Sequence, residues 1–214
     1  MNCTPFGHLA AGVDGSGDGG VRLLVEIARA DQMARGEGGS QGGAATPVLV
    51  LETTGATVHD AHRNLHWRSP REINWSHTQA VIIGEDLARR GIAPVLDWFD
   101  RDEQARRTLL LLVTNGPARN IFQAQPEHEA TLAEEINMLV KRTNEKSQGY
   151  VPLLNDFLYC LNSGSRHPVA GCLEVVEVEE PQEGRPAGSE KGGGQGDGAG
   201  RAPLPPRALR LAGL

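Results

Sequence analysis

The sequence predicts an α/β (α+β) domain in which helices flank one mixed β-sheet, followed by a low-complexity tail. Two observations lead to this class. Short apolar segments typical of strands are interleaved with longer segments whose apolar residues recur at helical spacing. Asp-Gly and Gly-Gly pairs also separate two apolar runs near the front, which indicates a hairpin. With 214 residues and 39% apolar content, the chain is long enough for one core.

The first elements are two strands joined by a tight turn. Residues 8–14 (HLAAGVD) and 21–29 (VRLLVEIAR) are the two apolar runs, and DGSGDGG, residues 14–20, lies between them. The glycine-rich stretch at residues 36–47 then predicts a long loop.

A third strand and the first helix follow. Residues 47–54 (PVLVLETT) have the β-branched composition of a strand. Residues 57–67 place apolar side chains at helical spacing after Thr57, a good N-cap. Pro70 ends this helix because proline disfavours the helical conformation at the residue before it.

The remaining segments continue the alternation of strand and helix. Gly91 ends one short helix, and Pro94 lies in the first turn of the next. The expected strands are residues 79–85, 108–115 and 172–180, and the expected helices are residues 85–91, 92–102, 117–123, 130–146 and 150–161.

The composition changes at residue 180. Residues 180–214 are rich in Gly, Pro and small polar residues, and ordering them would cost about 1–2 kcal/mol each with little apolar surface to bury. We therefore expect an α/β domain over residues 1–179 and a disordered tail over residues 180–214. The closing residues 204–214 are expected to be frayed, a short docking helix being the alternative.

The glycines of residues 14–20 allow three interpretations. Gly15, Gly17 and Gly20 have the GxGxxG spacing of a dinucleotide-binding loop, and Glu52 ends the strand that would follow. That fingerprint needs a helix starting at the last glycine, whereas the next residues are β-branched. A calcium loop would need Glu at its twelfth position, which is Val25. The favoured interpretation is a hairpin turn that binds no cofactor.

Other polar clusters are interpreted as structural. His59, His62 and His66 share a predicted helix face and could in principle hold zinc, but a solvated face is preferred. The acidic pairs Glu134–Glu135 and Asp100–Asp102 are likewise interpreted as solvated helix charges. The three cysteines have no CxxC spacing. We therefore assign no catalytic residue, cofactor or metal.

Charge and hydropathy narrow the possible partners. The net charge of −6 and the lack of a basic stripe argue against nucleic-acid binding. No apolar run reaches the ~18–20 residues that a membrane-spanning helix needs. The opening MNCTPFGHLAAG has neither a basic n-region nor an apolar h-region, and no lipobox precedes Cys3, so we expect a chain without a signal peptide or lipid anchor.

An ordered set of short motifs runs from Ala56 to Arg107. The motifs are Ala61 with Arg63-Asn64-Leu65, Ser69-Pro70-Arg71, Ser76-His77, Val81-Ile82-Ile83-Gly84-Glu85, Ala88-Arg89-Arg90-Gly91-Ile92, and Leu96-Asp97 with Arg101-Asp102. In this order they resemble the N-terminal domain of the Ger(x)C family, the C subunit of spore nutrient-germinant receptors. With weaker pieces on either side, the resemblance covers residues 8–179.

The resemblance implies a function and a location. Members of the family are non-enzymatic lipoproteins at the spore inner membrane, with several mixed α/β domains, and they act with an A and a B membrane subunit in germination. This chain departs from the pattern in that no lipobox and no later domains are expected from its sequence, which a truncated or divergent copy or an incomplete gene model would explain.

The resemblance singles out signature positions without assigning them a contact. They are Ser69, Pro70, Arg71, Ser76, His77, Gly84 and Glu85. The expected function is a non-catalytic interaction domain of a germinant receptor. The alternative, from another class, is a nucleotide-dependent oxidoreductase that uses the Gly15–Gly20 loop.

Overall fold

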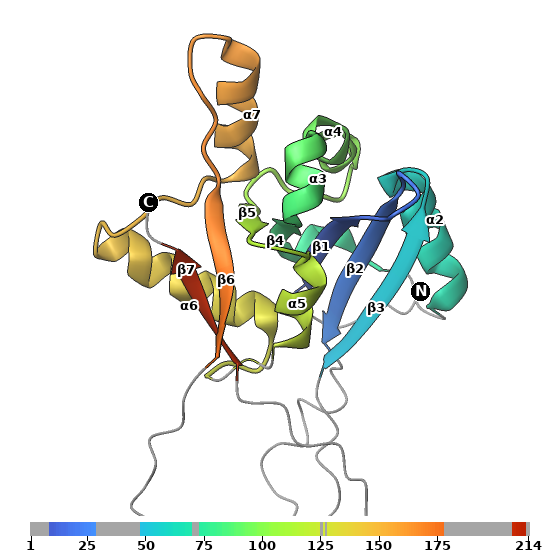
Figure 1. The fold of residues 1–214 in the computed structure, drawn as a ribbon, viewed down its shortest axis with the longest axis horizontal. Helices are drawn as coiled ribbons and strands as arrows, with labels where there is room; N and C mark the ends of the chain where they lie inside the picture. Colours follow the sequence, from blue (N-terminus) through green and yellow to red (C-terminus); the bar gives the residue numbers. More distant parts are fainter. Residues whose placement is uncertain are drawn as a thin grey trace, which may run out of the picture.

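The computed structural model describes residues 9–28, 48–69, 73–124, 126, 128–177 and 207–212. Within them, strands and helices alternate as expected (Figure 1). The strands are β1 (Leu9–Gly15), β2 (Val21–Ala28), β3 (Val48–Gly55), β4 (Thr78–Ile83), β5 (Leu110–Thr114), β6 (Gly171–Glu177) and β7 (Arg207–Ala212). The helices are α2 (Val58–Arg68), α3 (Glu85–Arg90), α4 (Ala93–Arg101), α5 (Ala118–Gln123), α6 (Leu132–Glu145) and α7 (Leu154–Ser163), and η1 (Trp75–His77) is a 3-10 turn.

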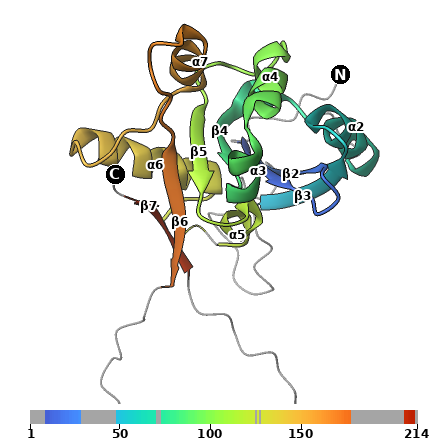
Figure 2. The same cartoon turned by 45° about the horizontal axis from the view of Figure 1, so that its top comes forward.

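These strands form one mixed sheet in the order β3-β2-β1-β4-β5-β6-β7. The first three are antiparallel neighbours, and β1, β4, β5 and β6 run parallel. The last strand, β7, is antiparallel to β6. The edge strands β3 and β7 lie on opposite sides of the molecule in both views (Figures 1 and 2). The predicted α/β class with a mixed sheet is confirmed.

The glycine-rich stretch at residues 14–20 is a hairpin turn. The N–H of Ser16 donates to the carbonyl of Gly20 at 3.0 Å, and the N–H of Gly19 donates back to the carbonyl of Ser16 at 3.0 Å. Gly19 has a φ of 88°, which glycine adopts without strain. Because Val21 begins a strand and not a helix, no helix N-terminus is available here to hold a pyrophosphate. The structure therefore does not support the oxidoreductase alternative.

Helices cover both faces of the sheet because alternate residues of each central strand point to opposite sides. Val81 and Ile83 of β4 belong to a core cluster with residues of α2, α3, α4 and α7. Ala80 and Ile82 belong to a second cluster with residues of α5 and α6. A strand buried on both sides has the continuous apolar run seen in QAVIIGE.

The helix boundaries follow local signals in most places. Thr57 caps α2 by accepting a hydrogen bond from the N–H of Asp60 at 3.1 Å, and the helix ends before Ser69, as predicted. Pro117, expected as the first helical residue, instead lies one position earlier in extended geometry. Its fixed φ of −72° suits either position.

The end of the chain differs from the expected disorder. Residues 207–212 form β7, which pairs with β6 over six residue pairs. Leu209 is buried against the α6 side of the sheet, so the segment does have apolar surface to contribute. The disorder predicted for residues 180–214 is therefore wrong for residues 207–212, and the other tail residues lie outside the described part. The domain limits 1–179 and 180–214 stay a prediction.

Candidate functional site

The signature positions do not form one cluster. Ser76 and His77 precede β4, whereas Gly84 and Glu85 follow it. A six-residue strand is about 20 Å long, so the two pairs lie at opposite ends of β4. Ser69 caps the end of α2, where its N–H donates to the carbonyl of Leu65 at 3.1 Å. Pro70 and Arg71 lie outside the described residues.

Gly84 and Glu85 take part in a clasp at the carboxyl ends of β1, β4 and β5. The N–H of Gly84 donates to the carbonyl of Val13 at 2.9 Å, which ties β4 to β1. Two hydrogen bonds join Glu85 and Gly116. The backbone N–H of Glu85 donates to the carbonyl of Gly116, and its Oε2 accepts from the N–H of Gly116, both at 3.0 Å. These signature residues therefore hold the strand ends together.

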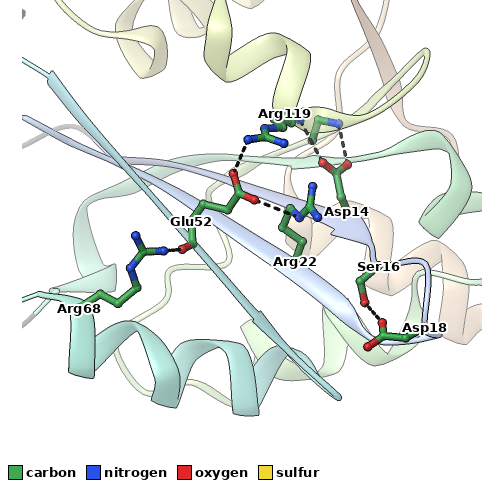
Figure 3. A network of polar contacts seen from close by, with 8 residues as sticks. Asp14, Ser16, Asp18, Arg22, Glu52, Arg68 and Arg119 are labelled. Carbon is green, nitrogen blue, oxygen red and sulfur yellow. Dashed lines mark hydrogen bonds and ion pairs between the residues drawn. The ribbon is translucent and has the colours of Figure 1, made fainter.

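Asp14 completes this clasp from the end of β1. Its carboxylate is buried and accepts from the backbone N–H of Ala118 at 2.6 Å and of Arg119 at 3.0 Å (Figure 3). Burial raises the pKa of Asp14, while the two N–H donors act in the opposite direction. Both oxygens are engaged by the start of α5, which favours a structural role for Asp14 over proton transfer.

A group of ion pairs extends the clasp across the hairpin. Glu52 of β3 pairs with Arg22 of β2 at 3.1 Å and with Arg119 of α5 at 3.4 Å (Figure 3). Arg68, at the end of α2, donates to the backbone carbonyl of Glu52. The side chain of Glu52, the acidic residue of the dinucleotide interpretation, is thus held by two arginines of the same domain.

A second buried carboxylate holds α6. Glu26 of β2 is 2% exposed, and it accepts from the N–H of Leu132 at 2.7 Å and of Ala133 at 3.1 Å. Glu135, expected to be solvated, is also buried and accepts from the N–H groups of His128 and Glu129, each at 3.2 Å. Sequence reasoning missed Glu135 because its partners lie in an irregular segment that has no periodicity.

Glu26 makes stability depend on pH. Burial raises its pKa to about 7 and the nearby Glu134 adds to this, against the two N–H donors. Since the pKa is raised on folding, its contribution is fully present below the unfolded pKa of about 4.5 and is lost as pH rises through about 7. We expect Glu26→Gln, which cannot ionise, to remove this dependence. The free energy of unfolding of the wild type relative to the variant should fall by about 2.5 kcal/mol from pH 5 to pH 8.

Urea unfolding at four pH values between 5 and 8 measures this difference. Glu145→Gln, at the exposed end of α6, is the matched control and should show a difference that does not change with pH. A Glu26→Gln difference that stays flat or rises with pH would mean that the N–H donors outweigh burial.

A groove of about 1010 Å³ lies between α2 and α4. Its floor is apolar and its rim carries charges of both signs. The floor includes Val58, Ile73, Leu87 and Val95, and the rim includes Arg90, Asp97, Arg101, Asp102 and Glu103. Asp102 also stabilises the following turn by accepting from the N–H of Gln104 at 2.9 Å.

An aromatic cluster forms one wall of this groove. The ring of Trp98 lies 5.2 Å from that of Trp75, 5.1 Å from that of His62 and 4.7 Å from that of Phe99. The Nε1–H of Trp75 donates to Nε2 of His62 at 3.0 Å. Burial lowers the pKa of His62, with a smaller effect from His66. His62 is half-buried, whereas a solvated position was expected. Its neutral ring can accept a hydrogen bond.

The histidine row of α2 does not converge on a metal site. Nε2 of His62 is already bonded to Trp75, and His59 and His66 are exposed. Across the described part of the chain, no group of three or more His, Cys, Asp or Glu side chains could hold a metal ion. No helix among these residues is long and apolar enough to cross a bilayer.

The fold and its groove define a mixed α/β domain whose buried carboxylates bind backbone N–H groups and whose concave surface is aromatic. A family model described as the spore germination protein N-terminal domain matches residues 8–175. The chain therefore belongs to this family of spore germination proteins, and the resemblance to the Ger(x)C family is confirmed.

Two curated relatives come from Bacillus subtilis (strain 168). The putative spore germination protein YfkR is 38% identical over 119 residues, which are 55% of this chain and 31% of that protein. Spore germination protein KC is 29% identical over 164 residues, 75% of this chain and 40% of that protein. The chain thus spans less than half the length of either relative. No solved structure matches the chain.

Proposed function

We propose that this chain acts in spore germination as a non-catalytic interaction domain of a nutrient-germinant receptor. The family match over residues 8–175 carries the proposal. Its partners are the A and B membrane subunits of the receptor, and it associates with the spore inner membrane peripherally, through them. The clasp at the strand ends supports a non-catalytic role because the carboxylates of Asp14 and Glu85 are occupied by backbone donors.

The groove between α2 and α4 is the proposed contact surface. Protein interfaces have an apolar, aromatic centre and a charged rim, and Trp and Arg dominate their binding energy. The groove has this composition, with Trp98 in its wall and Arg90 and Arg101 on its rim. The side chain of Arg101 is 79% exposed, so it is available to a partner.

Charge reversal on the rim tests this surface. Arg101→Glu should lower recovery of the A and B subunits about tenfold when the tagged full chain is co-purified with them in detergent, because an exposed arginine on the rim is replaced by a residue of opposite charge. The domain should remain folded, since the exposed pair of Arg101 with Asp97 contributes little to stability.

Lys141→Glu is the matched control. Lys141 is exposed on α6, on the opposite face of the sheet, and its reversal should leave recovery unchanged. Equal recovery with both variants would contradict the groove as contact surface. Failure of the unaltered chain to retain either subunit would contradict the receptor assignment itself.

A further inference from the structure

The sheet ends in a strand that is joined to it by an unusually long connection. Antiparallel neighbours are commonly joined by two to five residues. Between β6 and β7 the chain has 29 residues, 178–206. This connection is longer than a usual hairpin turn, and the pairing of β7 with β6 is what the described residues show of its attachment to the sheet.

The contacts between β7 and β6 resemble those that an added peptide strand makes with the edge of a sheet. Leu209 and Leu211, on one face of β7, pack with Leu173 of β6 in the core cluster that also contains residues of α6. On the other face, Arg210 stands directly opposite Glu174, and the guanidinium lies 3.1 Å from its carboxylate. One face of the strand thus offers apolar side chains and the other a complementary charge, as in strand addition to a sheet edge.

The edge of β6 would be open without this segment. The backbone of β6 from Cys172 to Glu177 pairs with β7 along its whole length. An unpaired edge of this length is a template for another strand. Exchange of an identical element between copies is a low-cost route to a dimer because every contact is kept.

We propose that the β6 edge is a strand-binding site and that a second copy of this chain can supply its Arg207–Ala212 segment to it. The segment of the same chain has the advantage at low concentration, because the covalent connection of 29 residues gives it an effective concentration of about a millimolar at the β6 edge. The exchanged form should therefore appear as the protein concentration approaches that value.

The register supplies a direct test with the full chain. Cys172 stands opposite Ala212, and the Cα atoms of such pairs lie within disulfide range. One partner retains Cys172 and carries Cys3→Ser and Cys160→Ser. The other, with a different tag, carries these two changes plus Cys172→Ser and Ala212→Cys. A strand bound in trans joins the two chains, and the Arg210→Glu variant below separates this link from one formed by random collision.

We expect a disulfide-linked heterodimer whose yield rises with total concentration up to about a millimolar. Oxidation is carried out at alkaline pH, because burial raises the pKa of the Cys172 thiol. Adding Arg210→Glu to the donating chain should lower the yield about fivefold, since like charges then face each other across the strands. Glu174→Arg in the accepting chain should restore it.

Three results would overturn the proposal. The first is complete closure of a single chain that has both Cys172 and Ala212→Cys, with no heterodimer in the mixture, because the edge would then bind only its own strand. The second is a yield that Arg210→Glu leaves unchanged, because the link would then be collisional. The third is failure of the single chain to close, because the register would then be wrong.

Discussion

Gly84→Ala should destabilise the domain by about 3 kcal/mol, although alanine is the smallest possible addition. The backbone of Gly84 is ordinary extended chain, with φ −65° and ψ 149°, so alanine introduces no conformational strain. Its Cβ, however, would overlap Oδ1 of Asp14 and lie 3.3 Å from the backbone nitrogen of Ala118. Asp14 would have to leave the N–H groups of α5, and a buried carboxylate would lose its partners.

Thermal unfolding followed by circular dichroism measures this effect. A loss of about 3 kcal/mol corresponds to a fall in Tm of about 6–12 °C for a chain of this size. Gly17→Ala is the matched control, since a Cβ there meets nothing within 4 Å and the Tm should hardly change. Equal Tm values for the two variants would show that the strand ends are not closely packed around Asp14.

Trp75→Ala should lower the free energy of unfolding by about 3–5 kcal/mol, because it empties the space of a large buried ring. Trp75 is 1% exposed, and its ring lies edge-on to those of Trp98 and Phe99. Removal of the Trp75 side chain leaves a cavity beneath the groove. Nε2 of His62 also loses the hydrogen bond that it accepts from Trp75. Urea unfolding should show a lower midpoint with little change in slope.

Trp67→Ala is the control for losing a tryptophan. Trp67 belongs to α2 but is 87% exposed, so its removal should change the free energy of unfolding by less than about 0.5 kcal/mol. Trp75→Phe separates the two contributions, because it keeps most of the ring volume but cannot donate the hydrogen bond to His62. A Trp75→Ala variant as stable as Trp67→Ala would refute the packing described for α2 and α4.

The order of strands and helices could be predicted from the sequence because it depends on local signals. The hairpin turn at residues 14–20, the Thr57 cap and the buried run of β4 each follow from a few neighbouring residues. The strand at residues 207–212 could not be predicted in this way. Its six residues follow a Gly- and Pro-rich stretch, and its partner β6 lies far earlier in the chain. Local composition carries no information about such a distant pairing.

The candidate site is only partly accessible to sequence reasoning. The family resemblance indicates Gly84 and Glu85 as signature positions. The sequence assigns Asp14 to the hairpin but does not show that it lies beside Gly84 and binds the start of α5. The aromatic wall of the groove is missed because His62, Trp75 and Trp98 come from three separate elements. A weak signal exists, since Trp75 and Trp98 are two of only three tryptophans in a chain with 4% aromatic residues.

The position of β1 has a consequence for how the chain acquires its structure. On one side β1 pairs with β2, its neighbour in sequence, and on the other with β4, which ends only at Ile83. During synthesis the three-stranded meander is complete once Gly55 has left the ribosome, while the opposite edge of β1 still awaits its partner. Parallel pairing between distant segments forms slowly, so a nascent chain halted between these two points would expose the unpaired edge of β1 to other chains.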